Sequence, residues 1–117
     1  MKILSRKEFM KTPIGTVFSY YEPTIFHELM IKASDLSQRW ETDFLYDPII
    51  GAVKNVSSED FALKCEQMEK GESMLMDFEY TGREGLFDQE QLFAVYEKGD
   101  VEKLIKRLQE TLLQKQQ

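Results

Sequence analysis

The sequence holds little of what several common classes of site require. Among its 117 residues are one cysteine, Cys65, and one histidine, His27. An intramolecular disulfide is therefore impossible, and neither residue belongs to an HxxxH or CxxC spacing typical of zinc sites. A buried, inert thiol and a packed or half-exposed imidazole explain the two residues best. A single cysteine also suits a reducing cytoplasm, which is the compartment that we expect.

Positive charge and long apolar runs are scarce as well. The chain carries 15 Lys and Arg against 21 Asp and Glu, a formal net charge of −6. Broad binding to DNA or RNA backbones needs a basic surface, so we expect neither polymer as a partner. No apolar run approaches the length that crosses a membrane, and the charged segment MKILSRKEFMKTP is not typical of a signal peptide. We expect a soluble protein that does not contact a membrane.

Catalytic motifs are missing too. The sequence contains no P-loop, no GxGxxG and no GxSxG. Asp77 and Glu79 share one face of an expected strand, and paired carboxylates can bind a metal ion or transfer protons. A solvated sheet face is the simpler explanation of this pair. We therefore expect no enzymatic activity, no catalytic residue, no metal and no cofactor.

With 6 Gly and 3 Pro, most of the chain is expected to be ordered. Capping-box spacing of Ser5 and Glu8 predicts the start of a short helix, and Ser57 predicts the start of another that runs from about Ser58 to Lys70. A third helix follows Asp100 and carries an apolar stripe. Alternating or β-branched segments predict five strands: Thr16–Glu22, Ile25–Lys32, Trp40–Tyr46, Ser73–Tyr80 and Gln91–Glu97.

Short turns between these strands favour antiparallel pairing. We expect one α+β domain over residues 1–117, with a small antiparallel sheet of about five strands, helices packed on one face and a C-terminal helix. Aromatic side chains lie on both faces of several strands. In so short a chain a second subunit could cover the other face, so we expect a homo-oligomer.

The segment TGREGLFD, residues 81–88, combines groups that a nucleotide site needs. Gly82 and Gly85 let the backbone come close to a ligand. Arg83 offers a planar, permanently charged group suited to phosphate, and Phe87 offers a ring on which a base could stack. Asp88 could accept hydrogen bonds from a ribose. The simpler alternative is a hairpin loop with one solvated arginine and with Phe87 in the core.

Two segments resemble a known family. They are KEFMKTPIGTVFSYYEPTIFHELMIK, residues 7–32, and FEYTGREGLFDQEQLFAVYEKGDVEKLIKRLQ, residues 78–109. Both resemble small phage proteins of the first Thoeris anti-defence family. These proteins bind the cyclic ADP-ribose signal of the bacterial Thoeris TIR enzyme without degrading it, so the downstream effector stays inactive. Members form symmetric oligomers, and some bind cyclic oligonucleotides of the CBASS defence at separate sites. Residues 33–72 show no such resemblance.

The resemblance implies a phage sponge that sequesters a cyclic nucleotide in the cytoplasm of the infected bacterial host. When roles are placed on the matching stretch by side-chain chemistry, Arg83 would hold a phosphate, Phe78 or Phe87 would stack on adenine, and Asp88 would contact a ribose. Tyr20 is a further stacking candidate, because the Tyr20–Tyr21 pair presents one ring to each face of its strand. The alternative function is an acidic protein–protein inhibitor or nucleic-acid mimic encoded by a phage.

Overall fold

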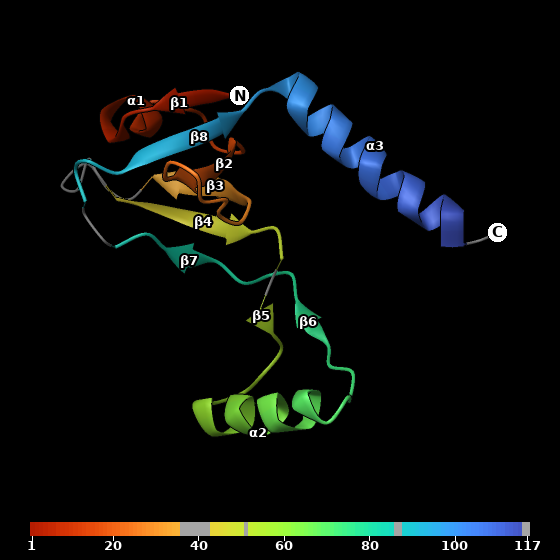
Figure 1. Ribbon diagram of the computed structural model, residues 1–117. Coiled ribbons are helices and arrows are strands. Elements are labelled where there is room, and N and C mark those ends of the chain that lie inside the picture. Colours follow the sequence, from red (N-terminus) through yellow and green to blue (C-terminus); the bar gives the residue numbers. More distant parts are fainter. Residues whose placement is uncertain (36–42, 51, 86–87, 116–117) are drawn as a thin grey trace.

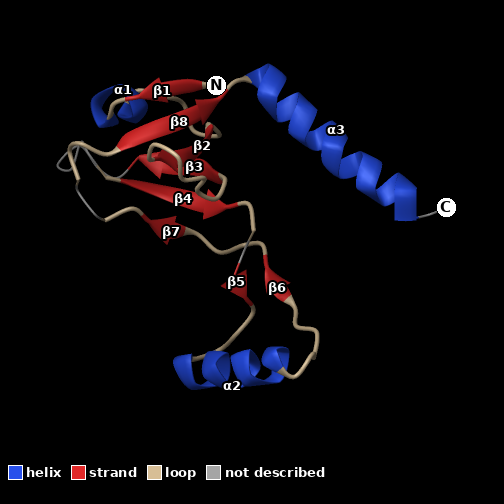
Figure 2. Ribbon diagram, in the orientation of Figure 1, coloured by secondary structure: helices blue, strands red, loops and turns tan. Residues whose placement is uncertain are grey.

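The computed structural model describes residues 1–35, 43–50, 52–85 and 88–115 (Figure 1). Figure 2 separates the helices from the strands. In chain order the elements are β1 (Lys2–Leu4), α1 (Arg6–Met10), β2 (Val17–Tyr21), β3 (Met30–Asp35), β4 (Phe44–Pro48), β5 (Ala52–Val53), α2 (Ser58–Glu69), β6 (Met76–Asp77), β7 (Gly82–Arg83), β8 (Leu92–Tyr96) and α3 (Lys98–Lys115).

Six of the strands form one sheet in the order β1-β8-β2-β3-β4-β7, and every neighbouring pair is antiparallel. The predicted α+β class, with an antiparallel sheet and a C-terminal helix, is confirmed. The edge strands β1 and β7 are not predicted from the sequence. They contain three and two residues, which is too short for an alternating pattern to show.

One face of this sheet carries an aromatic core that α1 covers. Phe9 of α1 stacks on Phe93 of β8, with ring centroids 4.3 Å apart and planes 7° apart. Phe44 meets Phe9 edge-on at 5.0 Å, and Phe18 and Met30 complete the buried cluster. Each such side chain contributes about 1.5–3 kcal/mol by leaving water. The helix has only five residues, and it stays on the sheet because its one aromatic ring, Phe9, packs against the rings of three phenylalanines on the strands.

Two of the three predicted helix starts are confirmed in detail, whereas the third is predicted too late in the chain, because α3 begins at Lys98 and Asp100 lies in its first turn. The Ser5 hydroxyl accepts from the Glu8 N–H at 3.2 Å, and the Glu8 carboxylate accepts from the Ser5 N–H at 3.0 Å, which completes a capping box at α1. Ser57 accepts from the Asp60 N–H at 3.0 Å and so caps α2. These signals are local in sequence, so one sequence suffices to read them.

The second expected strand, Ile25–Lys32, begins late. Ile25 forms only an isolated bridge with Glu22 across the turn, and β3 starts at Met30. Lys32 points to the core side and is buried, and its ammonium donates to the backbone carbonyls of Met10 and Thr12. The alternation of side chains along β3 places the Lys32 ammonium on the apolar side of the sheet. The two backbone carbonyls compensate the cost of burying this charge there.

Two other expected strands also differ from the structure. Of the strand predicted at Ser73–Tyr80, only Met76–Asp77 is paired, with β5 in a separate two-stranded sheet. The strand predicted at Trp40–Tyr46 is observed as β4, Phe44–Pro48. The first three residues of the predicted strand, 40–42, lie outside the described part of the chain.

The three helices differ in how they meet the six-stranded sheet. Only α1 lies on it. Together, α2, β5 and β6 form a projection beyond the β7 edge, and we call residues 52–80 the arm (Figure 1). From the end of β8, α3 extends away from the sheet, so its residues Val101 and Leu104 are half-buried while Leu108 and Leu112 are exposed. The C-terminal half of this helix has no packing partner among the residues that the structure describes.

Candidate functional site

Arg83, the predicted phosphate-binding residue, lies on the edge strand β7 opposite Leu45. Its Nε donates to Oδ2 of Asp43, a carboxylate that is fully buried, while 56% of the Arg83 side chain is exposed. The other oxygen of Asp43 accepts from the N–H groups of Phe44 at 2.9 Å and Gly85 at 3.0 Å. The glycine-flanked segment is therefore tied to β4 by one carboxylate.

The charge of Asp43 is set by two opposing effects. Burial raises its pKa, but the hydrogen bonds from the Gly85 N–H, from Arg83 and from the Phe44 N–H outweigh burial and hold the pKa below its usual range. The carboxylate is thus ionised at neutral pH and fixes the Arg83 guanidinium at the sheet edge. A fixed, half-exposed guanidinium can contact an anion without losing much side-chain entropy.

A second arginine holds the start of the β7–β8 connection. Arg6 of α1 donates to both carboxylate oxygens of Glu84, at 2.7 and 3.1 Å, and its Nε donates to the Asp88 carbonyl at 2.6 Å. The side chains of Arg6 and Glu84 are both buried. This pair fixes both ends of the segment around the predicted loop. Its role is structural, because neither side chain is open to a ligand.

The remaining predicted site residues lie in different surroundings. Phe78 follows β6 on the arm, and 70% of its surface is exposed. Asp88 is exposed, and one of its carboxylate oxygens accepts from the Glu90 N–H at 3.0 Å. Tyr20 is half-buried beside the aromatic core, where burial first and the nearby Glu84 second raise the pKa of its phenol. Phe87 lies outside the described residues.

The structure does not gather these residues into one cluster. Gly82 pairs with Tyr46, which packs on the core side of the sheet, so its neighbour Arg83 points to the opposite side. Tyr20 packs on the same side as Tyr46, and Phe78 belongs to the arm. As ligand contacts, these residues remain predictions. Among the predicted site residues that the structure describes, Arg83 and Asp88 belong to the connection around β7 that Asp43 and Arg6 fix.

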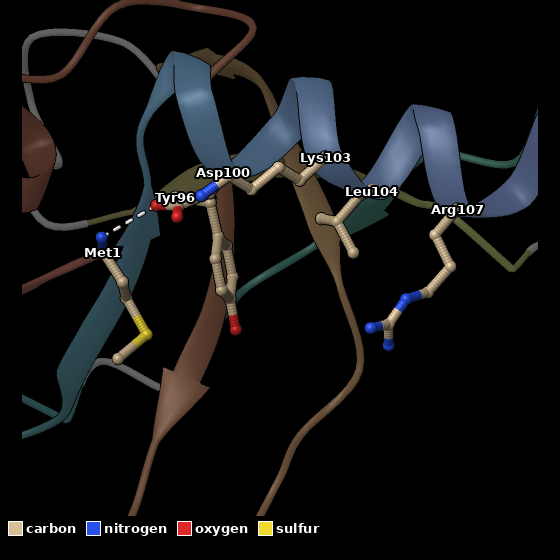
Figure 3. A pocket seen from close by; sticks show the side chains of 6 residues that line it. All are labelled: Met1, Tyr96, Asp100, Lys103, Leu104 and Arg107. Atoms are coloured by element: carbon tan, nitrogen blue, oxygen red, sulfur yellow. Dashed lines mark hydrogen bonds and ion pairs between the residues drawn. The ribbon is translucent and has the colours of Figure 1, made fainter.

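A cavity of about 400 Å³ lies beside α3 and the end of β8 (Figure 3). The four residues that α3 contributes are spaced by three and four positions, so they share one side of the helix. Figure 3 shows the Tyr96 hydroxyl and the Arg107 guanidinium pointing to the same side of the helix, with the Leu104 side chain between them. The lining consists of Met1, Tyr96, Asp100, Lys103, Leu104 and Arg107.

The cavity carries local positive charge in an acidic chain. Asp100 accepts from the N-terminal ammonium of Met1 at 2.8 Å and from the Glu97 N–H at 3.1 Å, and these bonds, the ammonium first, hold its pKa below the usual range. Its charge is therefore already balanced. Among the residues that the structure describes, neither Lys103 nor Arg107 takes part in an ion pair. Two cations, a phenol ring and a leucine are groups that suit a small anion with an aromatic part.

Tyr96, Lys103 and Arg107 are not among the site residues predicted from the sequence. In the sequence the two cations belong to the polar face of the last helix, for which solvation is the ordinary explanation. The available signal is the spacing of two cations by four residues, soon after a tyrosine that ends a strand. That signal becomes specific only when the strand and the helix are placed beside each other.

No protein-family model, curated protein or solved structure matches the chain. None of the helices in the described ranges is long and apolar enough to cross a membrane. Within those same ranges, no group of three or more His, Cys, Asp or Glu side chains is placed to hold a metal ion.

Proposed function

We propose that the protein binds and sequesters a small cyclic nucleotide of the cyclic ADP-ribose type without degrading it. It would do so as a homo-oligomer in the cytoplasm of a phage-infected bacterium. The observation that carries the proposal is the cavity beside α3, whose lining includes Lys103, Arg107 and Tyr96. The class of ligand comes from the resemblance of residues 7–32 and 78–109 to the first Thoeris anti-defence family.

The size and chemistry of the cavity support a ligand of this class. A volume of about 400 Å³ falls in the range of about 300–1,000 Å³ of small-molecule sites. A cyclic ADP-ribose carries a pyrophosphate and an adenine, which match two cations and one ring. Among the described residues of the lining, the one carboxylate, Asp100, is engaged by the N-terminus and by a backbone N–H. The lining therefore supplies groups that support binding of an anion.

The contacts account for most of a useful affinity. Two charge-assisted hydrogen bonds contribute about 1.5–3 kcal/mol each, and stacking on Tyr96 adds about 1–3 kcal/mol. Micromolar binding corresponds to about −8 kcal/mol. The remainder, and any tighter binding, would come from enclosure of the ligand and from side chains that are already positioned.

Calorimetry with glyco-cyclic ADP-ribose tests the proposal directly. The complex is then denatured by heat, and the supernatant is separated by chromatography. Tight binding with the ligand recovered intact is the expected result. Recovery of a cleaved product would show an enzyme. Absence of binding, both to this ligand and to a cyclic oligonucleotide, would refute the proposal and leave the acidic protein–protein inhibitor as the leading alternative.

Three alanine variants locate the ligand. Arg107→Ala should weaken binding about tenfold or more, because it removes one charge-assisted contact. Lys106→Ala, on the same helix but outside the cavity lining, is the matched control and should bind normally. Arg83→Ala tests the sequence-based prediction that this arginine holds a phosphate, with a loss of more than tenfold. A loss in Arg83→Ala without a loss in Arg107→Ala would place the site at β7 and not at α3.

A further inference from the structure

The chain exposes more surface than a typical compact monomer of the same mass does. Its accessible surface is 9145 Å², whereas a folded monomer of 13.8 kDa is expected to expose about 6,600 Å². Its radius of gyration is 16.8 Å, against about 13 Å for a compact chain of this length. The excess of about 2,500 Å² comes from elements that project from the six-stranded sheet (Figure 1).

The first projecting element is α3. It has 18 residues and is therefore about 27 Å long. Its apolar stripe begins on the sheet with Val101 and Leu104, and continues into solvent with Ile105, Leu108 and Leu112, all of which are exposed. An amphipathic helix draws most of its stability from burying this stripe. Half of the stripe is left without a partner within the part of the chain that the structure describes.

The second projecting element is the arm. None of the residues of α2 is buried, although Phe61, Cys65 and Met68 share one of its faces at a spacing of four and three. The two-stranded sheet of the arm, β5 and β6, is too small to be stable alone. The arm also exposes large apolar side chains elsewhere: Val56, Leu63, Leu75, Met76, Phe78 and Tyr80.

The two projecting elements are complementary in charge. Within α3, five Lys and Arg face three Asp and Glu, a net charge of +2. Within the arm, residues 52–80, three Lys face seven Asp and Glu, a net charge of −4. A chain with a net charge of −6 thus separates a basic apolar helix from an acidic apolar arm. Opposite charges around two apolar surfaces favour contact between the surfaces.

We propose that α3 of one chain docks on the arm of a second copy, and that the second chain returns the same contact. This arrangement is a symmetric dimer with two identical α3–arm contacts. An obligate dimer interface buries about 2,000–5,000 Å² in total over both chains. The excess surface of each chain, about 2,500 Å², is enough for an interface at the upper end of that range. The inference rests on the homo-oligomer of the proposed function and does not depend on its ligand.

Sedimentation or light scattering of two neighbouring variants tests the role of α3. Leu112 and Leu113 are equally exposed, at 62%, but Leu113 lies about 100° around the helix, off the stripe. We expect Leu112→Glu to be monomeric under conditions where the wild type and Leu113→Glu are dimers. Circular dichroism checks that the fold of each variant is kept. A monomeric wild type would overturn this inference together with the oligomer of the proposed function. Dimers of both variants would overturn the inference alone.

Mixing experiments test whether the partner of α3 is the arm. Phe61→Lys adds positive charge to the arm and should also be monomeric, while Ala62→Lys on the next face of α2 should remain a dimer. Mixing Leu112→Glu with Phe61→Lys should restore a dimer, because one α3–arm contact is then intact in each pair. A dimeric Phe61→Lys would show that α3 pairs with something other than the arm and would overturn the proposal. So would a mixture that stays monomeric. Calorimetry with nucleotide is separate, so a protein that dimerises but binds no nucleotide fails only the ligand part of the proposed function.

Discussion

Removal of the Arg6 guanidinium probes the interaction that holds the β7–β8 connection to α1. Arg6 makes two hydrogen bonds to Glu84 and one to the Asp88 carbonyl, and both charged side chains are buried. Loss of one partner of a buried pair costs about 3–5 kcal/mol, because the other charge stays buried without compensation. Proteins of this length have a free energy of unfolding of roughly 6–18 kcal/mol. We therefore expect Arg6→Met to remove a large part of the stability of the chain.

Urea unfolding followed by circular dichroism measures this loss. Lys7→Met is the matched control, because Lys7 is exposed on the same short helix, and it should change the free energy of unfolding by less than about 0.5 kcal/mol. The double variant Arg6→Met, Glu84→Met removes both charges and should regain most of the loss, since apolar side chains of similar volume replace buried ion pairs at little cost. The single variant Glu84→Met is measured as well. If the double variant loses as much free energy of unfolding as Arg6→Met and Glu84→Met together, this reasoning is refuted. An Arg6→Met variant as stable as Lys7→Met would refute it as well.

Further predictions concern the β4–β7 edge and the start of α3. Because the pKa of Asp43 is lowered from 3.8, its ionised form stabilises the fold at neutral pH, and this stability is lost as the pH falls through the folded-state pKa. Asp43→Asn should lower the melting temperature at pH 7 and flatten its decline below about pH 4, and equal slopes would contradict the assignment. A Cβ on Gly82 would lie 2.7 Å from the Tyr46 ring, so Gly82→Ala should cost about 1–3 kcal/mol. A Cβ on Gly99 meets nothing within 4 Å, so Gly99→Ala should raise the free energy of unfolding by about 0.4–1 kcal/mol. If the melting temperatures of Gly82→Ala and Gly99→Ala shift in the same direction, crowding by Tyr46 is not the cause.

The parts of the fold that follow from local chemistry can be predicted from this sequence. Capping by Ser5 and Ser57 depends on residues three positions away, and both caps are found. The strands β2 and β8, VFSYY and LFAVY, are rich in β-branched and aromatic residues over five positions, which is enough for a strand to be predicted. The edge strands and the small sheet of the arm have only two or three residues each. They exist because a neighbouring strand offers hydrogen bonds, and that neighbour is not local in sequence.

The candidate site depends even more on long-range placement. The partner of Arg83 is Asp43, 40 positions earlier, and the partner of Arg6 is Glu84, 78 positions later. A single sequence contains no pattern that joins such residues. The chemistry of TGREGLFD could be predicted residue by residue, but not the buried carboxylate that holds its arginine. For the same reason the cavity at α3 is invisible in the sequence, because the strand end, the helix and the N-terminus must first meet.

The position of α3 would link the proposed binding with the proposed assembly. Its first half rests on the sheet through Leu104 and contributes Lys103 and Arg107 to the cavity, while its second half leaves Leu108 and Leu112 in solvent. The cavity borders α3, so its shape depends on the angle between this helix and the sheet. Contact of the second half with an acidic arm would fix that angle. The two faces of α3 would then have linked roles. The apolar face would bind the second chain, and this contact would hold the cationic face where it can bind an anion.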